Sequence, residues 1–158
     1  MADEIAGPEQ ARLFSRIALR TWKATVGRFD DIVSALSDEE LEREVAPGKS
    51  RLFYLVGHLT ALHDRLLPAL GLGERRYADL DAEFGDERDD HHASALSPRR
   101  LRQLWNEVNA ALVAGMERLT PEQWLEAPAS VAAPSRLSAL LAWTAHVSLH
   151  ATQMRITR

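Results

Sequence analysis

The sequence of 158 residues contains no cysteine. This absence excludes disulfide bonds, thiolate metal ligands and a cysteine nucleophile, so any thiol chemistry would need an external thiol. Long apolar runs are missing too, since none approaches the roughly 20 residues of a membrane-spanning helix. The first residues, Met1-Ala2-Asp3-Glu4, lack the basic and then apolar pattern of a signal peptide. We therefore expect a cytoplasmic protein with no membrane partner.

An excess of basic residues is also missing. The chain has 23 acidic and 19 basic side chains, a formal charge of -4, and gives no electrostatic reason to expect nucleic acid as a partner. We find no glycine-rich phosphate loop, no Ser-His-Asp order and no pair of catalytic carboxylates. The 46% of hydrophobic residues can form a core without a structural metal. We expect one domain, residues 1–158, in which a metal would serve chemistry more than folding.

Apolar residues recur at steps of three and four along four long segments, and no segment alternates like a β-strand. These segments begin near Pro8, after Pro47-Gly48, at Ser97-Pro98 and near Ser135. The pattern predicts an all-α protein, a four-helix bundle. Residues 72–97, between the second and third helices, are acidic and irregular, and we expect them to form a long crossover connection.

Three histidines form the best candidate for a chemical site. His146 and His150 stand four residues apart in the last predicted helix, so both imidazoles project from one face and can bind the same cation. His58 stands in an apolar part of the second helix, beside a row of leucines, from which it could reach the last helix. The three together would complete a facial triad of ligands.

A helical wheel of the last segment predicts that its histidine face points into the bundle. Within roughly 60° of His146 lie Ala139, Ala142, Trp143, His150 and Gln153. Thr144 falls near the opposite side. The small alanines leave space beside the imidazoles for a ligand, and Trp143 could line a substrate pocket.

Each histidine also has a simpler interpretation as a packed side chain bonded to a carbonyl or to water. The His146 and His150 pair is not the zinc-protease motif, because no glutamate stands between the two histidines. We expect His91 and His92 to lie in a solvated part of the acidic connection.

His63 is a weaker candidate for a ligand. It lies about 140° from His58 around the helix, so we expect a surface or flanking position. Its neighbour Asp64 is expected to pair with Arg65 or Arg102.

The segments 51–64, around His58, and 146–153, which ends in Gln153, resemble the DinB-like superfamily of metal-binding four-helix bundles. The resemblance spans most of the chain. It implies that His58, His146 and His150 bind a divalent metal ion, with zinc or nickel most suitable and iron also compatible. It also implies that Gln153 orients a ligand or a bound water. The family often has Arg-Gly before this glutamine, where the present chain has Ala151-Thr152.

The resemblance further implies an activity. Similar bundles include thiol-dependent S-transferases and isomerases, in which the metal holds an incoming low-molecular-weight thiol as a thiolate. We therefore expect an enzyme that transfers or isomerises a small electrophilic substrate, although no catalytic residue or general base is identifiable. A metal-dependent hydrolase of a small ester or amide, or a non-catalytic helical interaction module, stays open. Family members also dimerise through bundle faces, so we expect a homodimer.

Overall fold

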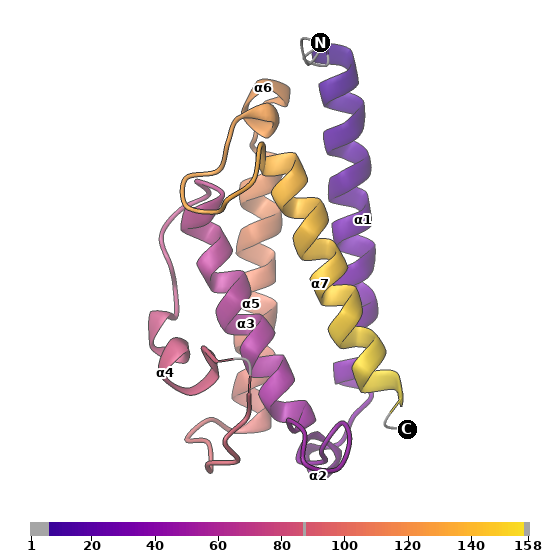
Figure 1. Cartoon of the computed structure of the whole chain (residues 1–158), viewed down its shortest axis with the longest axis vertical. Helices are drawn as coiled ribbons and strands as arrows, with labels where there is room; N and C mark the ends of the chain where they lie inside the picture. Colours follow the sequence, from indigo (N-terminus) through magenta and orange to yellow (C-terminus); the bar gives the residue numbers. More distant parts are fainter. Residues whose placement is uncertain (1–6, 87, 157–158) are drawn as a thin grey trace.

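The computed structural model describes residues 7–86 and 88–156, which form seven α-helices and one 3-10 helix without any β-strand. The predicted all-α class is therefore confirmed for this part of the chain. The four long helices are α1 (Pro8–Ser34), α3 (Leu52–Ala69), α5 (Pro98–Glu117) and α7 (Arg136–Ile156) (Figure 1). Residues 1–4, whose sequence lacks the pattern of a signal peptide, lie outside the described residues, as do residues 157 and 158. No described helix has both the length and the apolar character needed to cross a membrane.

The long helices associate as two pairs. In Figure 1, α1 and α7 run downward side by side, and α3 and α5 run upward; contacts are extensive within each pair. By contrast, α3 and α7 touch over only a short stretch. This separation leaves room between α3 and α7 for the candidate site.

Side-chain caps mark the starts of one long helix, α5, and of two short helices. The Ser97 hydroxyl accepts a hydrogen bond from the backbone N–H of Arg100, and Pro98 occupies the first turn of α5, as predicted. The short helices α2 (Asp38–Leu41) and α6 (Pro121–Leu125) each begin with a capping box.

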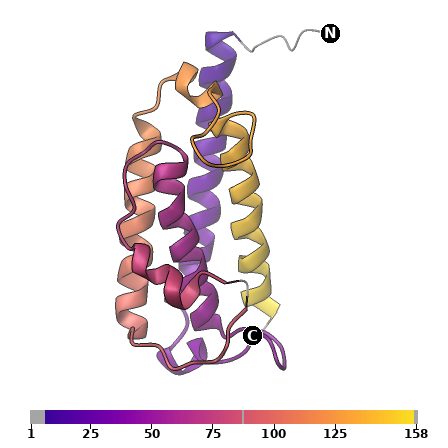
Figure 2. The ribbon, with the colours of Figure 1, turned by 60° about the vertical axis from the view of Figure 1, so that its left-hand side comes forward.

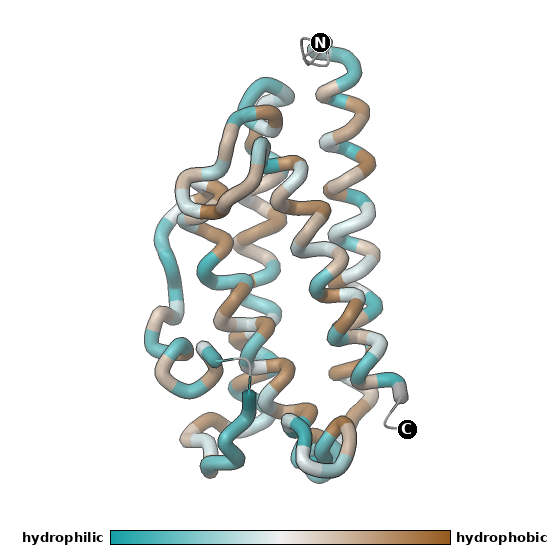
Figure 3. The backbone as a smooth tube through the Cα atoms, in the orientation of Figure 1, coloured by the Kyte–Doolittle hydropathy of each residue, from teal (hydrophilic) through white to brown (hydrophobic). Residues whose placement is uncertain are grey.

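Helix α3 is buried on nearly all sides, because the connection that follows it passes over its outer face (Figure 2). The other long helices keep an exposed side, and Figure 3 shows hydrophilic residues interspersed with hydrophobic ones along them. The connection is not irregular throughout, contrary to the sequence expectation: it contains η1 (Ala78–Leu80) and α4 (Asp81–Phe84). Leu80 and Phe84 are buried and hold these short helices against α3.

Candidate metal centre

Helix α3 places His58 on the side that faces α7. The side chain is 7% exposed, and its Nδ1 donates a hydrogen bond to the backbone carbonyl of Phe84, at 2.9 Å. Gly57 makes this approach possible: a Cβ at that position would lie 2.3 Å from Cδ1 of Phe84. Because Nδ1 carries the proton, the lone pair of His58 is on Nε2.

Helix α7 supplies the other two imidazoles, one turn apart. The Nε2 atoms of His146 and His150 lie 3.1 Å from each other. His150 Nδ1 donates to Oε1 of Gln153, at 2.8 Å, so the lone pair of His150 is on Nε2. Gln153 therefore lies beside the histidines, where its hydrogen bond fixes the tautomer of a candidate ligand.

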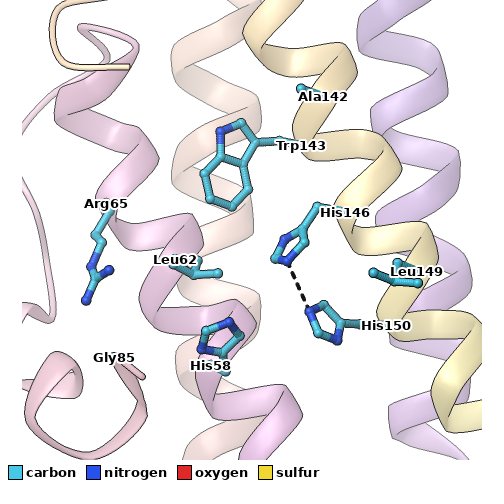
Figure 4. Close-up of a pocket in the computed structure, with 9 residues that line it drawn as sticks. All are labelled: His58, Leu62, Arg65, Gly85, Ala142, Trp143, His146, Leu149 and His150. Carbon is cyan, nitrogen blue, oxygen red and sulfur yellow. Dashed lines mark hydrogen bonds between the residues drawn. The ribbon is translucent and has the colours of Figure 1, made fainter. Parts of the chain in front are cut away.

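The three imidazoles converge (Figure 4). One nitrogen from each of His58, His146 and His150 lies within 4.8 Å of the other two, and no further group of three such residues occurs in the described parts of the chain. Two nitrogens bound to one first-row cation stand about 3.0 to 3.3 Å apart, given metal–nitrogen bonds of about 2.0 to 2.1 Å. The pair on α7 already has this spacing, and a nitrogen of His58 lies within 4.8 Å of both.

The protonation states also suit a cation. Burial lowers the pKa of His150 to about 4, an effect that the Gln153 hydrogen bond opposes and the neighbouring histidines reinforce. His150 is therefore neutral at pH 7 and itself loses no proton when it binds a metal. Its Nε2 lone pair faces the His146 Nε2 atom, and a shared cation would satisfy both atoms. The residues fit a metal.

A cavity of about 610 Å³ opens beside the three histidines. Trp143 lines it, and its ring meets His146 edge-on, with 5.4 Å between centroids and 85° between planes. Figure 4 shows the indole above the imidazoles, between α3 and α7. Trp143 thus borders the cavity, and its role in a substrate pocket stays a prediction. The complete lining consists of His58, Leu62, Arg65, Gly85, Ala142, Trp143, His146, Leu149 and His150.

The helical wheel was wrong about which side of α7 faces the core. The fully buried stripe runs through Leu140, Val147 and Met154, with Thr144 buried beside it rather than on the opposite side. This stripe is centred about 100° from the histidine face. His146 and His150 are only partly buried, because their face borders the cavity. The wheel failed because α7 is apolar on several sides, including the exposed Leu141 and Leu149.

His63 is fully buried, so the expected surface or flanking position was wrong. Its ring packs between Trp22 and Trp105, with centroids 4.9 and 5.0 Å away, and its Nδ1 donates to Oδ1 of Asn109 at 2.8 Å. Burial lowers its pKa to about 4. The wheel angle from His58 was correct, but α3 has hardly any solvent-facing side.

The expected partners of Asp64 were also wrong. This fully buried carboxylate accepts a hydrogen bond from Arg75 Nε, at 3.0 Å. It also accepts hydrogen bonds from the backbone N–H groups of Arg76 and Tyr77. Arg65 pairs with Asp81 instead, and Arg102 pairs with another carboxylate on α2. The loop after α3 brings Arg75 back over the helix, a return that sequence spacing does not indicate.

The remaining histidines lie on the surface, as expected. The side chains of His91 and His92 are 43% and 82% exposed, and both lie near carboxylates of the acidic connection. Sequence analysis did not identify Arg65 as part of the cavity wall. The signal was present, because Arg65 follows His58 by two helical turns and so shares its face.

Comparisons with known proteins agree with this architecture. A crystal structure of a conserved protein from Enterococcus faecalis is similar, with 18% identity, a TM-score of 0.58, and coverage of 90% of this chain and 94% of the other. At this identity the likeness concerns the fold alone. No curated protein matches the chain. The family model of the DinB superfamily matches residues 20–154, a range that contains all three histidines and Gln153. The chain therefore belongs to the DinB superfamily.

Proposed function

We propose that this protein is a divalent-metal-dependent enzyme of the DinB type that transfers or isomerises a small electrophilic substrate with an external low-molecular-weight thiol. His58, His146 and His150 would hold the metal. The observation that carries the proposal is the convergence of three imidazole nitrogens at the wall of a cavity of about 610 Å³. Zinc or nickel suits three neutral imidazoles, and Fe(II) is also compatible.

A bound cation would supply Lewis acidity, which lowers the pKa of a thiol or water molecule beside it. The protein residues orient the site. The Phe84 carbonyl and the Gln153 side chain hold the tautomers of His58 and His150, so both Nε2 lone pairs are available. None of the described residues that line the cavity is a carboxylate, so we assign no acidic general base there. Trp143 limits the space on one side of the histidines.

A second cavity supports a reaction with two substrates. It measures about 580 Å³ and is lined by His150 and Gln153 as well as by the basic residues Lys49 and Arg88. His150 thus borders both cavities. A transferase needs room for a thiol and an electrophile near one centre, whereas a hydrolase needs room for one substrate and water. The paired cavities favour the transferase.

Metal content is the first test. Protein purified without an affinity tag, and incubated with zinc, nickel or Fe(II), should contain about one metal ion per chain by elemental analysis. The variants His58→Ala and His146→Ala should lose it. His92→Ala is the matched control, since that side chain is exposed, and it should retain the metal. An empty wild-type protein would leave a helical interaction module as the better description.

Activity assays separate the two catalytic alternatives. Metal-loaded protein should consume electrophilic substrates only when a low-molecular-weight thiol is added. Hydrolysis of ester or amide substrates without thiol, lost in His146→Ala, would instead establish the hydrolase.

We also propose the finer architecture expected from the sequence: one domain over residues 1–158, in which the four long helices form a bundle and residues 72–97 form its crossover. A homodimer and a cytoplasmic location belong to the same proposal. The exposed Leu13, Phe14 and Ile17 on α1 offer an apolar surface for self-association.

A further inference from the structure

We propose that Arg65 forms an anion-binding subsite in the cavity beside the three histidines, and that the electrophilic substrate carries a carboxylate. The substrate class rests on the proposed function, whereas carboxylate binding by Arg65 can be tested separately. The proposal follows from the position of Arg65, from its unused donors and from the charge of the cavity wall.

Arg65 lies on the same face of α3 as His58. Seven residues separate them, which at about 100° per residue returns to within roughly 20° of the same direction. Both side chains line the cavity. Figure 4 shows the guanidinium group at the α3 side of the cavity, close to Gly85 and opposite the imidazoles of α7. A ligand that spans the cavity can therefore meet Arg65 at one end and the histidines at the other.

The hydrogen bonds of Arg65 leave its outer donors unused. Its Nε donates to both carboxylate oxygens of Asp81, each at 3.1 Å. Arg75 occupies the same two oxygens more closely, through Nη1 at 2.6 Å and Nη2 at 2.8 Å. Within the described residues, neither Nη1 nor Nη2 of Arg65 has a hydrogen-bond partner. These terminal nitrogens form one edge of the planar fork, which suits a carboxylate.

The backbone helps to fix this fork. A Cβ on Gly85 would lie 3.0 Å from Nη2 of Arg65, so the glycine lets the guanidinium group lie close to the chain. Asp81 holds the Nε edge at the same time. The side chain is 40% exposed, so a ligand can reach it from the cavity. An arginine oriented before binding loses less freedom when an anion arrives.

The charge of the cavity wall also selects an anion. Among the described residues, Arg65 is the one permanently charged side chain in the lining, and no carboxylate of residues 7–86 or 88–156 belongs to it. A metal ion on three neutral imidazoles would add further positive charge. Leu62, Trp143 and Leu149 add apolar surface to the lining of the cavity. The cavity therefore fits a small molecule with an apolar body and a carboxylate, held away from the reacting atom.

The test compares two probes that differ in charge but not in shape. Binding of phenylacetate and of its neutral amide, phenylacetamide, is measured by ligand-observed NMR with zinc-loaded and with chelator-treated protein. The proteins are the wild type, Arg65→Gln, Arg65→Lys and the control Arg100→Gln. Arg100 is suitable because its ion pair with Glu107 has similar exposure, 44%, and lies outside the cavity. Circular dichroism and zinc content are recorded for each variant.

We expect chelator-treated wild type to prefer phenylacetate by about tenfold or more, the strength of a charge-assisted hydrogen bond to arginine. Arg65→Gln should abolish this preference, Arg65→Lys should retain part of it, and Arg100→Gln should leave it unchanged. An unchanged preference in Arg65→Gln, or no preference in the wild type, overturns the subsite. If Arg65→Gln does not fold, a full preference in Arg65→Lys overturns the bidentate recognition. A wild-type protein that takes up neither zinc, nickel nor Fe(II) would refute the metal-dependent function, while the chelator-treated series still decides the role of Arg65.

Discussion

Replacing Gly57 with alanine tests how the fold holds the histidine of α3. A Cβ at this position would lie 2.3 Å from Cδ1 and 2.4 Å from Cε1 of Phe84. Ordinary carbon contacts are about 3.5 to 4.0 Å, so the ring would have to retreat by more than about 1 Å. Phe84 is 1% exposed and packs against Phe53 and Tyr54, with ring centroids 6.0 and 5.7 Å away. We expect this packed ring to retreat together with its backbone, whose carbonyl accepts the hydrogen bond from His58.

Two opposing effects set the expected change in stability. Overpacking of a core lowers the free energy of unfolding by about 1 to 3 kcal/mol, and replacing a helical glycine with alanine raises it by about 1 kcal/mol. Gly57→Ala should therefore lower the free energy of unfolding by about 0 to 2 kcal/mol. The effect on metal should be larger, because loss of an outer partner of a histidine ligand typically lowers metal affinity by about 10- to 100-fold.

Zinc affinity, measured by competition with a chromophoric chelator, and urea unfolding are the two readouts. Gly27→Ala is the matched control: Gly27 lies inside α1, and nothing lies within 4 Å of a Cβ there. This control should gain up to about 1 kcal/mol of stability and keep its zinc affinity. Wild-type zinc affinity in a folded Gly57→Ala variant would refute the idea that Phe84 positions His58.

A second substitution separates crowding from other effects of the new methyl group. Phe84→Leu shortens the side chain but keeps the backbone carbonyl. In the double variant Gly57→Ala with Phe84→Leu, space is restored and zinc affinity should return toward that of Phe84→Leu alone. If the double variant instead loses as much zinc affinity as the two single variants together, the methyl group does not act through Phe84.

Three further predictions follow from particular contacts. His63 has a folded pKa of about 4, below the ordinary 6.5, because it is buried; the unfolded chain takes up this proton first as the pH falls. The contribution of neutral His63 to the free energy of unfolding is therefore fully present above pH 6.5 and declines toward pH 4, with a loss of about 2 kcal/mol at pH 5. Urea unfolding of His63→Gln as a function of pH should lack this decline. Gln153→Ala removes the acceptor of His150 Nδ1 and should weaken zinc binding by about tenfold, whereas an unchanged chelator titration would exclude a role for Gln153 in metal affinity. Phe14→Glu places a charge in the exposed apolar surface of α1 and should convert the proposed homodimer to monomers in sedimentation velocity; a dimer unaffected by this change would use another face.

The sequence predicted the long helices because their signals are local. Periodic apolar residues mark each helix, and Ser97 with Pro98 marks the start of α5. The helices inside the connection were missed for the opposite reason. Four-residue α4 is too short to have a period, and it depends on Phe84 packing against α3. A helix stabilised by tertiary contacts leaves little trace in its own sequence.

In the candidate site, too, the features with a local sequence pattern were predicted, and the contacts with distant parts of the chain were not. The spacing of His146 and His150 is a local pattern, and the structure brings both close to His58. The supporting contacts are not local: the carbonyl that orients His58 is 26 residues away in the chain. Asp64 was expected to pair with Arg65 or Arg102, because sequence proximity says nothing about the loop that brings Arg75 to that carboxylate.

The two helices that form the site solve different structural problems. On α7 the buried stripe and the histidine face point in directions about 100° apart, so core packing and the site use separate residues. On α3 nearly every side is buried, so His58 has to be satisfied within the packing, which Gly57 and the Phe84 carbonyl achieve. On the α7 side of the cavity, Ala142 and Leu149 are exposed at the rim. We expect a substrate to pass this rim, beside the helix that contributes two of the three imidazoles, while the third imidazole is held in place from the buried side.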